Sequence, residues 1–476
     1  MPKNKRLENA LNAGKLIQLG FSLNDAKPQK LNLLYSVNCL NNFVNFGKIN
    51  NNDVAKTNDP EDSDFESDNS LSGSDDYEKS EILSLQFNQT QNLLATGDSN
   101  GRVQIYDVFS ACPISNEDDS NIKKSKLDLY YEKCDKISSI SVYNMPIITM
   151  KWHPYSNYSC NFLYYAHVNG YIGVCEKETL KKSILIQEKD EISCIDFNLD
   201  GSVLSSVGKD YTIKLYDSNL NGSENMNRIV KEYGTGIDSS SDKNSFFSSI
   251  SNAFSSILSS NNQSTSHTNR IQCVKFSNTS NDLFFTGGWD RSVKAWDKRS
   301  KKGFVNSFQG PFICGSDAID VNDHLVLTAS WVKENALELW DIRKFKKICS
   351  LPIVQENKNE DDSNIDKNSL SYKLRLKDPI VNEYLYACKF FPTTNRGFSD
   401  SKKINENKEV SRSSTSVLAC GSGTQSLHLL DYEQPTGRQL LSSINCQSPL
   451  YCMDAIYSLA ACGGVKNFFT VIGTSD

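Results

Sequence analysis

A short hydrophobic run that ends in an acidic residue recurs along the chain, and the spacing of its copies, about 40 residues or more, limits the possible folds more than any other feature. Residues 293–297 read Val-Lys-Ala-Trp-Asp, and residues 337–341 read Leu-Glu-Leu-Trp-Asp. A segment rich in small residues precedes each run, as in Leu-Ala-Thr-Gly at 94–97. Units of this size cannot bury a hydrophobic face alone, so copies must stack on one another.

Seven such runs align by their ends. They are Val103–Asp107, Ile172–Glu176, Ile213–Asp217, Val293–Asp297, Leu337–Asp341, Leu427–Asp431 and a degenerate copy, Phe468–Val471. In six of them a turn residue lies seven positions before the final acid: Asn100, Asn169, Asp210, Asp290, Glu334 and Thr424. Upstream segments alternate between apolar and polar residues, which predicts half-buried strands joined by tight turns.

The most complete copy reads Ser-His-Thr-Asn-Arg-Ile-Gln-Cys-Val-Lys-Phe-Ser at 266–277, followed by Gly-Gly-Trp-Asp at 287–290 and Trp-Asp at 296–297. This copy resembles one repeat of the WD-repeat family. The resemblance implies an all-β fold, a β-propeller in which every blade has four antiparallel strands. Seven repeats then imply seven blades.

In the WD-repeat family an Asp in the second turn reaches a His before the first strand and supports the Trp of the third strand. The matching residues are His267, Asp290 and Trp296, and this copy alone keeps all three. Other copies replace the Trp with Tyr106, Cys175, Tyr216 or Leu430. We therefore expect packing to hold those blades together without the polar relay.

The chain ends soon after its seventh run, so the outer strand of the last blade must come from elsewhere. The apolar segment Leu31–Val37 is the predicted donor. By pairing with the last blade it would join the two chain ends and close the ring, leaving no sheet edge bare.

A seven-bladed ring needs roughly 300 residues, so the 476 residues of this chain are expected to form one domain with insertions. We assign 1–50 to an N-terminal arm with the closing strand, 51–80 to an acidic disordered linker, and 81–476 to the propeller. Segments rich in Ser, Asn, Asp and Lys predict low-complexity, disordered insertions. They are 109–145, 218–266, 344–384 and 393–415.

The net charge of −6 arises locally, because residues 57–80 contain nine acids and one Lys. The rest of the chain is close to +2, without a long basic stripe, so no nucleic-acid partner is expected. No apolar run is long enough to cross a bilayer, so no membrane partner is expected either.

The 14 cysteines include many strand residues and no Cys-x-x-Cys, which predicts buried thiols in the cytoplasm or nucleus. The five His residues are scattered, so we expect no metal or other cofactor.

The resemblance implies a protein-binding rim made of the second turns and the starts of the first strands. The residues placed there are Tyr211, Arg270, Trp289, Arg291 and Trp331. Trp289 and Trp331 occupy equivalent positions in neighbouring blades, and Trp and Arg dominate the energetics of protein interfaces. The alternative is that each Trp packs against its neighbouring blade or under an insertion.

A second feature is Trp-Asp-x-Arg, which ends in Arg299 in one copy and in Arg343 in the next. This box resembles the one by which some WD-repeat proteins bind the adaptor of a cullin-type ubiquitin ligase. The alternative is that each Arg is an ordinary residue at a strand end.

No Gly-x-x-x-x-Gly-Lys, Gly-x-Ser-x-Gly or His-Glu-x-x-His motif is present, so an enzyme is not expected. The resemblance implies a non-catalytic protein-interaction scaffold, and the alternative is a ligase substrate receptor. A convergent cluster of titratable groups in the central channel would favour an enzyme.

Overall fold

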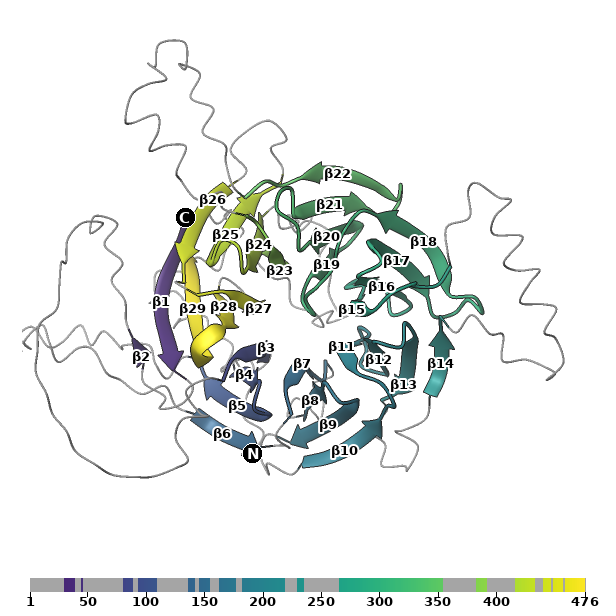
Figure 1. Ribbon diagram of the computed structural model, residues 1–476, viewed down its shortest axis with the longest axis horizontal. Helices are drawn as coiled ribbons and strands as arrows, with labels where there is room; N and C mark the ends of the chain where they lie inside the picture. The colour runs from purple at the N-terminus through teal and green to yellow at the C-terminus, as the bar shows by residue number, and fades with distance from the viewer. Residues whose placement is uncertain are drawn as a thin grey trace, which may run out of the picture.

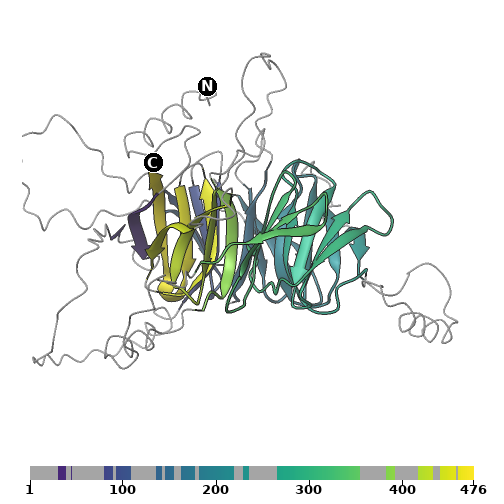
Figure 2. The ribbon, with the colours of Figure 1, turned by 90° about the horizontal axis from the view of Figure 1, so that it is seen from above.

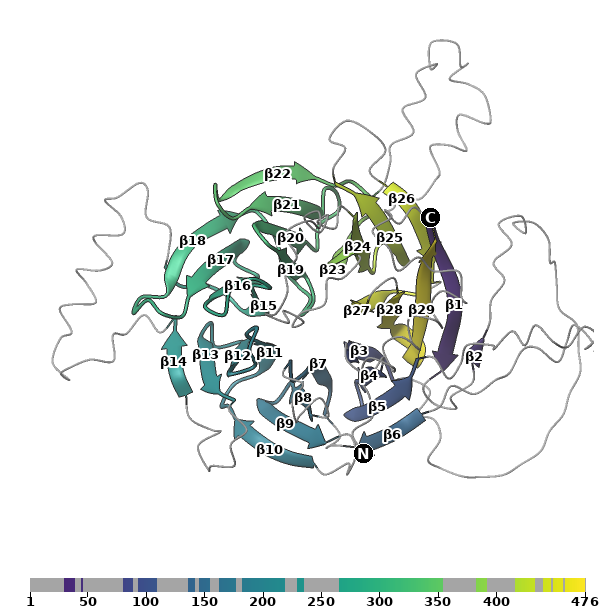
Figure 3. The ribbon, with the colours of Figure 1, turned by 180° about the vertical axis from the view of Figure 1, so that it is seen from behind.

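Each predicted repeat forms a separate antiparallel sheet in the computed structural model, and the seven sheets surround a central axis as blades (Figure 1). Figure 2 shows the ring edge on, and Figure 3 shows the opposite face. The structure describes residues 30–38, 44–45, 80–88, 93–108, 136–141, 145–154, 162–176, 182–218, 229–234, 265–353, 382–391, 416–432, 440–446, 448–456 and 459–475. The seven-bladed propeller predicted from the repeats is confirmed.

The strands of each blade follow one another outward from the axis, and the seven blades are numbered in chain order. The first strands are β3 (Ile82–Asn88), β7 (Ile147–Trp152), β11 (Ile192–Phe197), β15 (Ile271–Phe276), β19 (Ile319–Asn322), β23 (Leu385–Phe391) and β27 (Leu450–Ile456). The second strands are β4 (Leu93–Asp98), β8 (Phe162–His167), β12 (Val203–Gly208), β16 (Leu283–Gly288), β20 (Leu325–Ala329), β24 (Ser416–Gly421) and β28 (Leu459–Gly464). The third strands are β5 (Arg102–Asp107), β9 (Tyr171–Glu176), β13 (Ile213–Asp217), β17 (Ser292–Asp297), β21 (Leu337–Asp341), β25 (Ser426–Asp431) and β29 (Phe468–Ser475). The fourth strands are β6 (Lys136–Ser141), β10 (Lys182–Gln187), β14 (Ile229–Tyr233), β18 (Phe304–Gln309), β22 (Lys346–Ser350), β26 (Leu440–Asn445) and β1 (Lys30–Asn38).

Small residues in the second strands allow successive blades to pack closely. A Cβ atom on Gly287 of β16 would lie 2.8 Å from both Ile313 and Ile319, which belong to the connection into blade five and to its first strand. A Cβ atom on Gly97 of β4 would likewise lie 2.7 Å from Ile147 of blade two. The small-residue segments of the sequence are therefore the places where neighbouring sheets meet.

The N-terminal segment closes the ring, as predicted. Strand β1 pairs antiparallel with β29 from Lys30 opposite Ser475 to Asn38 opposite Phe468, and so supplies the fourth strand of blade seven. A short further strand, β2 (Val44–Asn45), pairs with β1. Closure covers an edge of β29 that would otherwise expose a row of unpaired backbone groups.

Three fourth strands lie inside ranges that the sequence assigned to insertions. Strand β6 falls within 109–145, β14 within 218–266 and β22 within 344–384, so those three boundaries were too wide. The burial of β14 and β22 explains the error, because most of their residues are exposed or half-buried at the circumference. Strands of this kind lack the alternation between apolar and polar residues that identifies the inner strands.

Most of the remainder of those ranges lies outside the described residues, as do residues 51–79 and 392–415, so the predicted disorder of these segments stays a prediction. Besides strands, the described elements include a short 3₁₀ helix, Val465–Asn467. Nothing helical in the described part of the chain has the length and apolar character needed to span a membrane.

Candidate functional site: the rim and the central channel

A hydrogen-bonded chain of four side chains holds the rim end of blade four. His267 Nδ1 lies 2.8 Å from Asp290 Oδ2, and His267 Nε2 lies 2.7 Å from Thr286 Oγ1. Trp296 Nε1 donates to the same Thr286 oxygen at 2.7 Å. The expected relay of His267, Asp290 and Trp296 thus passes through Thr286, a residue that the sequence analysis missed.

A neutral His267 with its proton on Nδ1 satisfies every donor in this chain, because Thr286 then donates its hydroxyl proton to Nε2. Burial lowers the pKa of His267 more than the hydrogen bond to Asp290 raises it. Burial alone raises the pKa of Asp290, but the hydrogen bonds from His267 and Ser292 outweigh it and the net shift is downward. A neutral imidazole beside an ionised carboxylate is consistent with both shifts.

Replacing Asp290 with Ala should destabilise the protein by about 1–3 kcal/mol, because it leaves the buried Nδ1–H of His267 without its acceptor. Equilibrium unfolding in urea provides the measurement. A matched control is Glu334→Ala, since Glu334 occupies the equivalent turn position in blade five and its side chain is exposed. An equal, small loss in both variants would contradict the relay.

Blade three contains a different polar relay, so the expectation that blades without the Trp rely on packing alone is wrong there. Glu188 occupies the place of the His, and Tyr216 donates its hydroxyl to Glu188 Oε1 at 3.0 Å. Lys214 Nζ contacts Glu188 Oε2 and Asp210 Oδ2, each at 2.5 Å, and Ser206 also donates to Glu188. Spacing could have revealed this relay, because Glu188 precedes Ile192 by the four positions that separate His267 from Ile271.

The predicted rim residues lie at one end of blades three to five. Arg270 forms an ion pair with Glu191 and lies over the ring of Trp289, with its guanidinium carbon 5.6 Å from the ring centre. The Trp331 ring lies 4.8 Å from that of Tyr384. Tyr211, Trp289 and Trp331 nevertheless keep 42%, 41% and 39% of their surface exposed. Trp331 thus contacts a residue that leads into the neighbouring blade, as the alternative expected, whereas Arg270 belongs to the same blade as Trp289. Both Trp side chains present a large apolar surface to solvent.

In each blade, the turn between the second and third strands contains one residue with positive φ at the same position. These residues are Gly101, Gly170, Tyr211, Arg291, Asn335, Gln425 and Asn467. Gly adopts this left-handed conformation freely and Asn does so readily, whereas other L-residues pay about 1–2 kcal/mol for it. Tyr211 (φ 63°) and Arg291 (φ 55°) thus place bulky side chains on the rim in a strained backbone conformation.

Two Tyr residues that the sequence analysis missed extend the aromatic surface towards the axis. Tyr386 and Tyr451 occupy β-bulges near the starts of β23 and β27, and their rings lie 5.7 Å apart. Burial raises the pKa of Tyr386, and hydrogen bonds with Ser422 and Trp331 oppose this rise. The aromatic surface therefore continues from Trp331 across blades six and seven.

The two Arg residues of the Trp-Asp-x-Arg boxes follow the ends of the third strands, at the face opposite the rim. Arg299 Nη2 lies 2.7 Å from Asp297 Oδ2, and Arg343 Nη2 lies 3.1 Å from Asp341 Oδ2. The hydrogen bond from Arg343 lowers the pKa of Asp341 to about 2. Their side chains remain 72% and 64% exposed. Each Arg is thus accessible, but it is already paired with the Asp of its own box.

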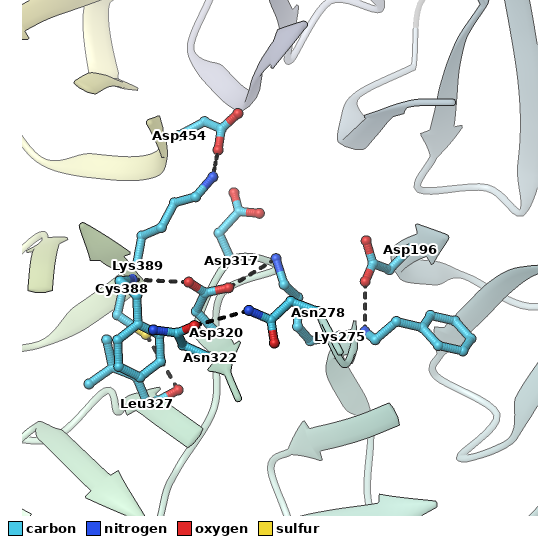
Figure 4. A network of polar contacts seen from close by, with 12 residues as sticks. Asp196, Lys275, Asn278, Asp317, Asp320, Asn322, Leu327, Cys388, Lys389 and Asp454 are labelled. Carbon is cyan, nitrogen blue, oxygen red and sulfur yellow. Dashed lines mark hydrogen bonds and ion pairs between the residues drawn. The ribbon is translucent and has the colours of Figure 1, made fainter. Parts of the chain in front are cut away.

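A convergent cluster of titratable groups does occur in the central channel (Figure 4). Each first strand contributes one residue from an equivalent position: Gln86, Lys151, Asp196, Lys275, Asp320, Lys389 and Asp454. We call this set the channel ring. Three lysines and three aspartates alternate in sign over six successive blades. The uncharged Gln86 occupies the equivalent position of the remaining blade. The ring lines a cavity of about 140 Å³.

Ion pairs connect neighbouring members of the channel ring. Lys275 Nζ lies 3.2 Å from Asp320 Oδ1, and Lys389 contacts Asp454. Gln86 connects Asp454 of blade seven with Lys151 of blade two, because its Nε2 donates to Asp454 at 2.6 Å and its Oε1 accepts from Lys151 at 3.2 Å.

Each Asp of the ring also accepts a hydrogen bond from the backbone of a neighbouring blade. Asp196 accepts from Phe276 N at 2.7 Å, Asp320 from Phe390 N at 3.0 Å, and Asp454 from Phe87 N at 2.7 Å. The aspartates thereby fasten pairs of blades at the axis.

The pairing within the channel limits its chemistry. Burial by itself lowers the pKa of Lys151, but the carboxylates of Asp317 and Asp196 reverse the effect and hold the pKa above its ordinary value. A lysine that acts as a base or nucleophile needs the opposite shift. Within the described ranges, no three His, Cys, Asp or Glu side chains come together in a way that could hold a metal ion.

Comparison with known proteins agrees with this architecture. The family model described as "WD domain, G-beta repeat" matches residues 65–107, 180–217 and 259–297. The "Cross-pathway control WD-repeat protein 2" of Flammulina velutipes is 34% identical over 86 residues, which cover 18% of this chain and 27% of the relative. The "Small ribosomal subunit protein RACK1" of Neurospora crassa is 30% identical over 95 residues, again 18% and 27% of the two chains. The chain thus matches about a quarter of the length of these curated relatives.

Seven four-stranded blades around a charged channel define a β-propeller. With the three matched repeats and the Trp-Thr-His-Asp chain of blade four, this chain is a seven-bladed propeller that contains WD repeats. Proteins of the WD-repeat family typically serve as protein-interaction scaffolds and are generally non-catalytic.

Proposed function

We propose that this protein is a non-catalytic scaffold whose rim at blades three to five binds other proteins. The observation that carries the proposal is the pair of bulky residues, Tyr211 and Arg291, at strained positions where four of the other five blades have Gly or Asn. Strained backbone conformations cluster at functional sites, where the surrounding structure holds them in place. In the other five blades this position holds neither an aromatic residue nor an Arg. The turn can therefore form without such a side chain.

The surroundings of these two residues suit an interface. The guanidinium carbon of Arg291 lies 5.6 Å from the ring centre of Phe312, and none of the described carboxylates pairs with it. Trp289 is held by Arg270, which Glu191 fixes in turn. Rigid aromatic anchors beside Arg are the residues that contribute most to protein binding.

The channel ring supports the non-catalytic part of the proposal. Its lysines pair with carboxylates, Lys151 with Asp317 outside the ring, and its aspartates accept hydrogen bonds from backbone amides. The pKa of Lys151 is shifted away from neutrality. Such an arrangement suits a structural role better than acid–base chemistry. The ten cysteines in the described ranges are all free thiols, which supports a place in the cytoplasm or nucleus.

The test compares variants in affinity purification followed by mass spectrometry. Tyr211→Gly with Arg291→Gly should remove most co-purifying partners, and so should Trp289→Ala with Trp331→Ala. The Gly pair should leave stability unchanged or raise it by up to about 1 kcal/mol per site, because Gly relieves the backbone strain. Gln425→Gly is the matched control, since it relieves the same strain on blade six and should keep the partners.

The second candidate, a substrate receptor of a cullin-type ubiquitin ligase, is supported by the exposure of Arg299 and Arg343. Arg299→Ala with Arg343→Ala should leave the rim partners bound. If that variant loses a ligase adaptor while both rim variants keep every partner, the second candidate replaces the first.

A further inference from the structure

Two cysteines from neighbouring blades lie in contact near the closure of the ring. Cys446 follows β26 of blade six, and Cys462 belongs to β28 of blade seven. Their sulfur atoms are 3.8 Å apart. A disulfide has a sulfur–sulfur distance of about 2.05 Å, so bond formation requires the two atoms to approach by less than about 2 Å.

The two thiols differ in a way that suits successive reactions. Cys446 is half-buried and therefore reachable from solvent, whereas Cys462 is fully buried. The hydrogen bond from Cys462 lowers the pKa of Cys446 despite the opposing effect of burial, while the pKa of Cys462 is raised. A partly exposed thiol with a lowered pKa is the more reactive partner. The backbone N–H of Cys446 donates to Gln425 O at 2.9 Å, which fixes its place at the end of blade six.

A comparison with the channel thiols shows what distinguishes this pair. Cys194 and Cys273 also lie on neighbouring blades, and both contact the carbonyl oxygen of Ser316, at 3.4 and 3.0 Å. Both are fully buried beside the channel ring, so an oxidant in solvent does not reach them. Cys446 combines solvent access with a thiol neighbour.

We propose that Cys446 is a site of reversible oxidation by hydroperoxides, with Cys462 as its resolving thiol. The Cys446 thiolate attacks one peroxide oxygen, the O–O bond breaks, and the leaving hydroxide takes up a proton to become water. The sulfur of Cys462 then attacks the sulfur of the resulting Cys446 sulfenic acid. The S–O bond breaks, the S–S bond forms, and a second water leaves with the proton of Cys462. Two thiols lose two electrons, and one hydrogen peroxide becomes two waters.

The bond would connect two blades where the ring is closed. Strand β26 lies beside β1, the closing strand of blade seven (Figure 1). A disulfide from the end of β26 to β28 therefore fixes blade six to the blade that holds both ends of the ring. A constraint of this kind stabilises mainly by restricting the unfolded chain.

The experiment treats the reduced full-length protein with hydrogen peroxide, blocks the remaining thiols and analyses peptides by mass spectrometry. No Lys or Arg lies between Cys446 and Cys462, so chymotrypsin, which can cut after Tyr451, is needed to separate the two cysteines. We expect a linked pair of peptides containing Cys446 and Cys462, and a melting temperature that rises by several degrees until a reductant is added.

Substitutions test the order of the two steps. Cys462→Ser should leave a sulfenic acid at Cys446 that dimedone labels, and Cys446→Ser should abolish both the label and the linked peptides. Cys452→Ser, which removes the other cysteine between these two positions, should leave the disulfide unchanged. The proposal is overturned if peroxide leaves Cys446 as a thiol, or if the linked peptides join Cys446 to a different cysteine. Circular dichroism of the reduced variants checks that each one folds.

Discussion

Deleting residues 1–48 should cost this protein most of its stability, because blade seven would then have three strands and an open edge. Eight residue pairs join β1 to β29, and they connect the two ends of the described ring. Without them, β29 exposes unpaired backbone groups that favour aggregation. We expect a loss comparable with the whole stability of a typical domain, about 5–15 kcal/mol. Thermal melting and size-exclusion chromatography measure the two effects.

Two controls separate closure from a general effect of truncation. Deleting residues 2–26 leaves every described strand in place and should preserve the melting temperature. A peptide with residues 28–48, added to the larger deletion, should restore part of the lost stability by pairing with β29. A monomeric 1–48 deletion with an unchanged melting temperature would show that β1 does not close the ring.

Asp454→Ala should destabilise the protein by about 3–5 kcal/mol, because breaking a buried ion pair leaves its partner charged and unpaired. Asp454 is buried, contacts Lys389, and accepts hydrogen bonds from Gln86 Nε2 and from the backbone N–H of Phe87. The substitution therefore removes the contacts by which this one side chain connects blades six, seven and one. Urea unfolding gives the free energy of unfolding.

Two further variants distinguish charge from hydrogen bonding at this position. Asp454→Asn keeps an acceptor for Phe87 N but loses the charge, so it should lie between wild type and Asp454→Ala. Lys389→Met leaves Asp454 with its two hydrogen bonds and should cost less than Asp454→Ala. If Asp454→Ala lowers the free energy of unfolding by less than about 1 kcal/mol, the range of an exposed ion pair, the channel ring does not have the proposed structural role.

The inner strands could be predicted from the sequence because their signals are local. Buried apolar residues flank the polar Gln272 and Lys275 along β15, small residues mark β16, and the turn before β17 repeats with a fixed offset. The outer strands β6, β14 and β22 were predicted as parts of insertions. Exposed strands that are held mainly by backbone pairing show little alternation between apolar and polar residues. Their positions therefore depend on the neighbouring third strand.

The candidate site was predictable only in part, for a related reason. Tyr211, Arg270, Trp289, Arg291 and Trp331 follow from their places in the repeat. Thr286 was missed because a Thr at that place is ordinary until its partners are known. Glu188 was missed although its spacing from Ile192 matches that of His267 from Ile271. The strain at Tyr211 and Arg291 likewise appears only when the backbone angles of all seven turns are compared.

By itself, the sequence determined the number of blades and the order of the inner strands, because both depend on a local pattern that recurs from blade to blade. It also indicated the segment that closes the ring, because the last repeat lacks a fourth strand of its own. Only the tertiary structure decided which side chains meet around the axis and between blades. Gln86 and Asp454 are 368 positions apart, yet they share a hydrogen bond in the channel. Cys446 and Cys462 meet across a blade boundary. Contacts of this kind arise from closing a ring of sheets, which brings together residues that no local pattern connects.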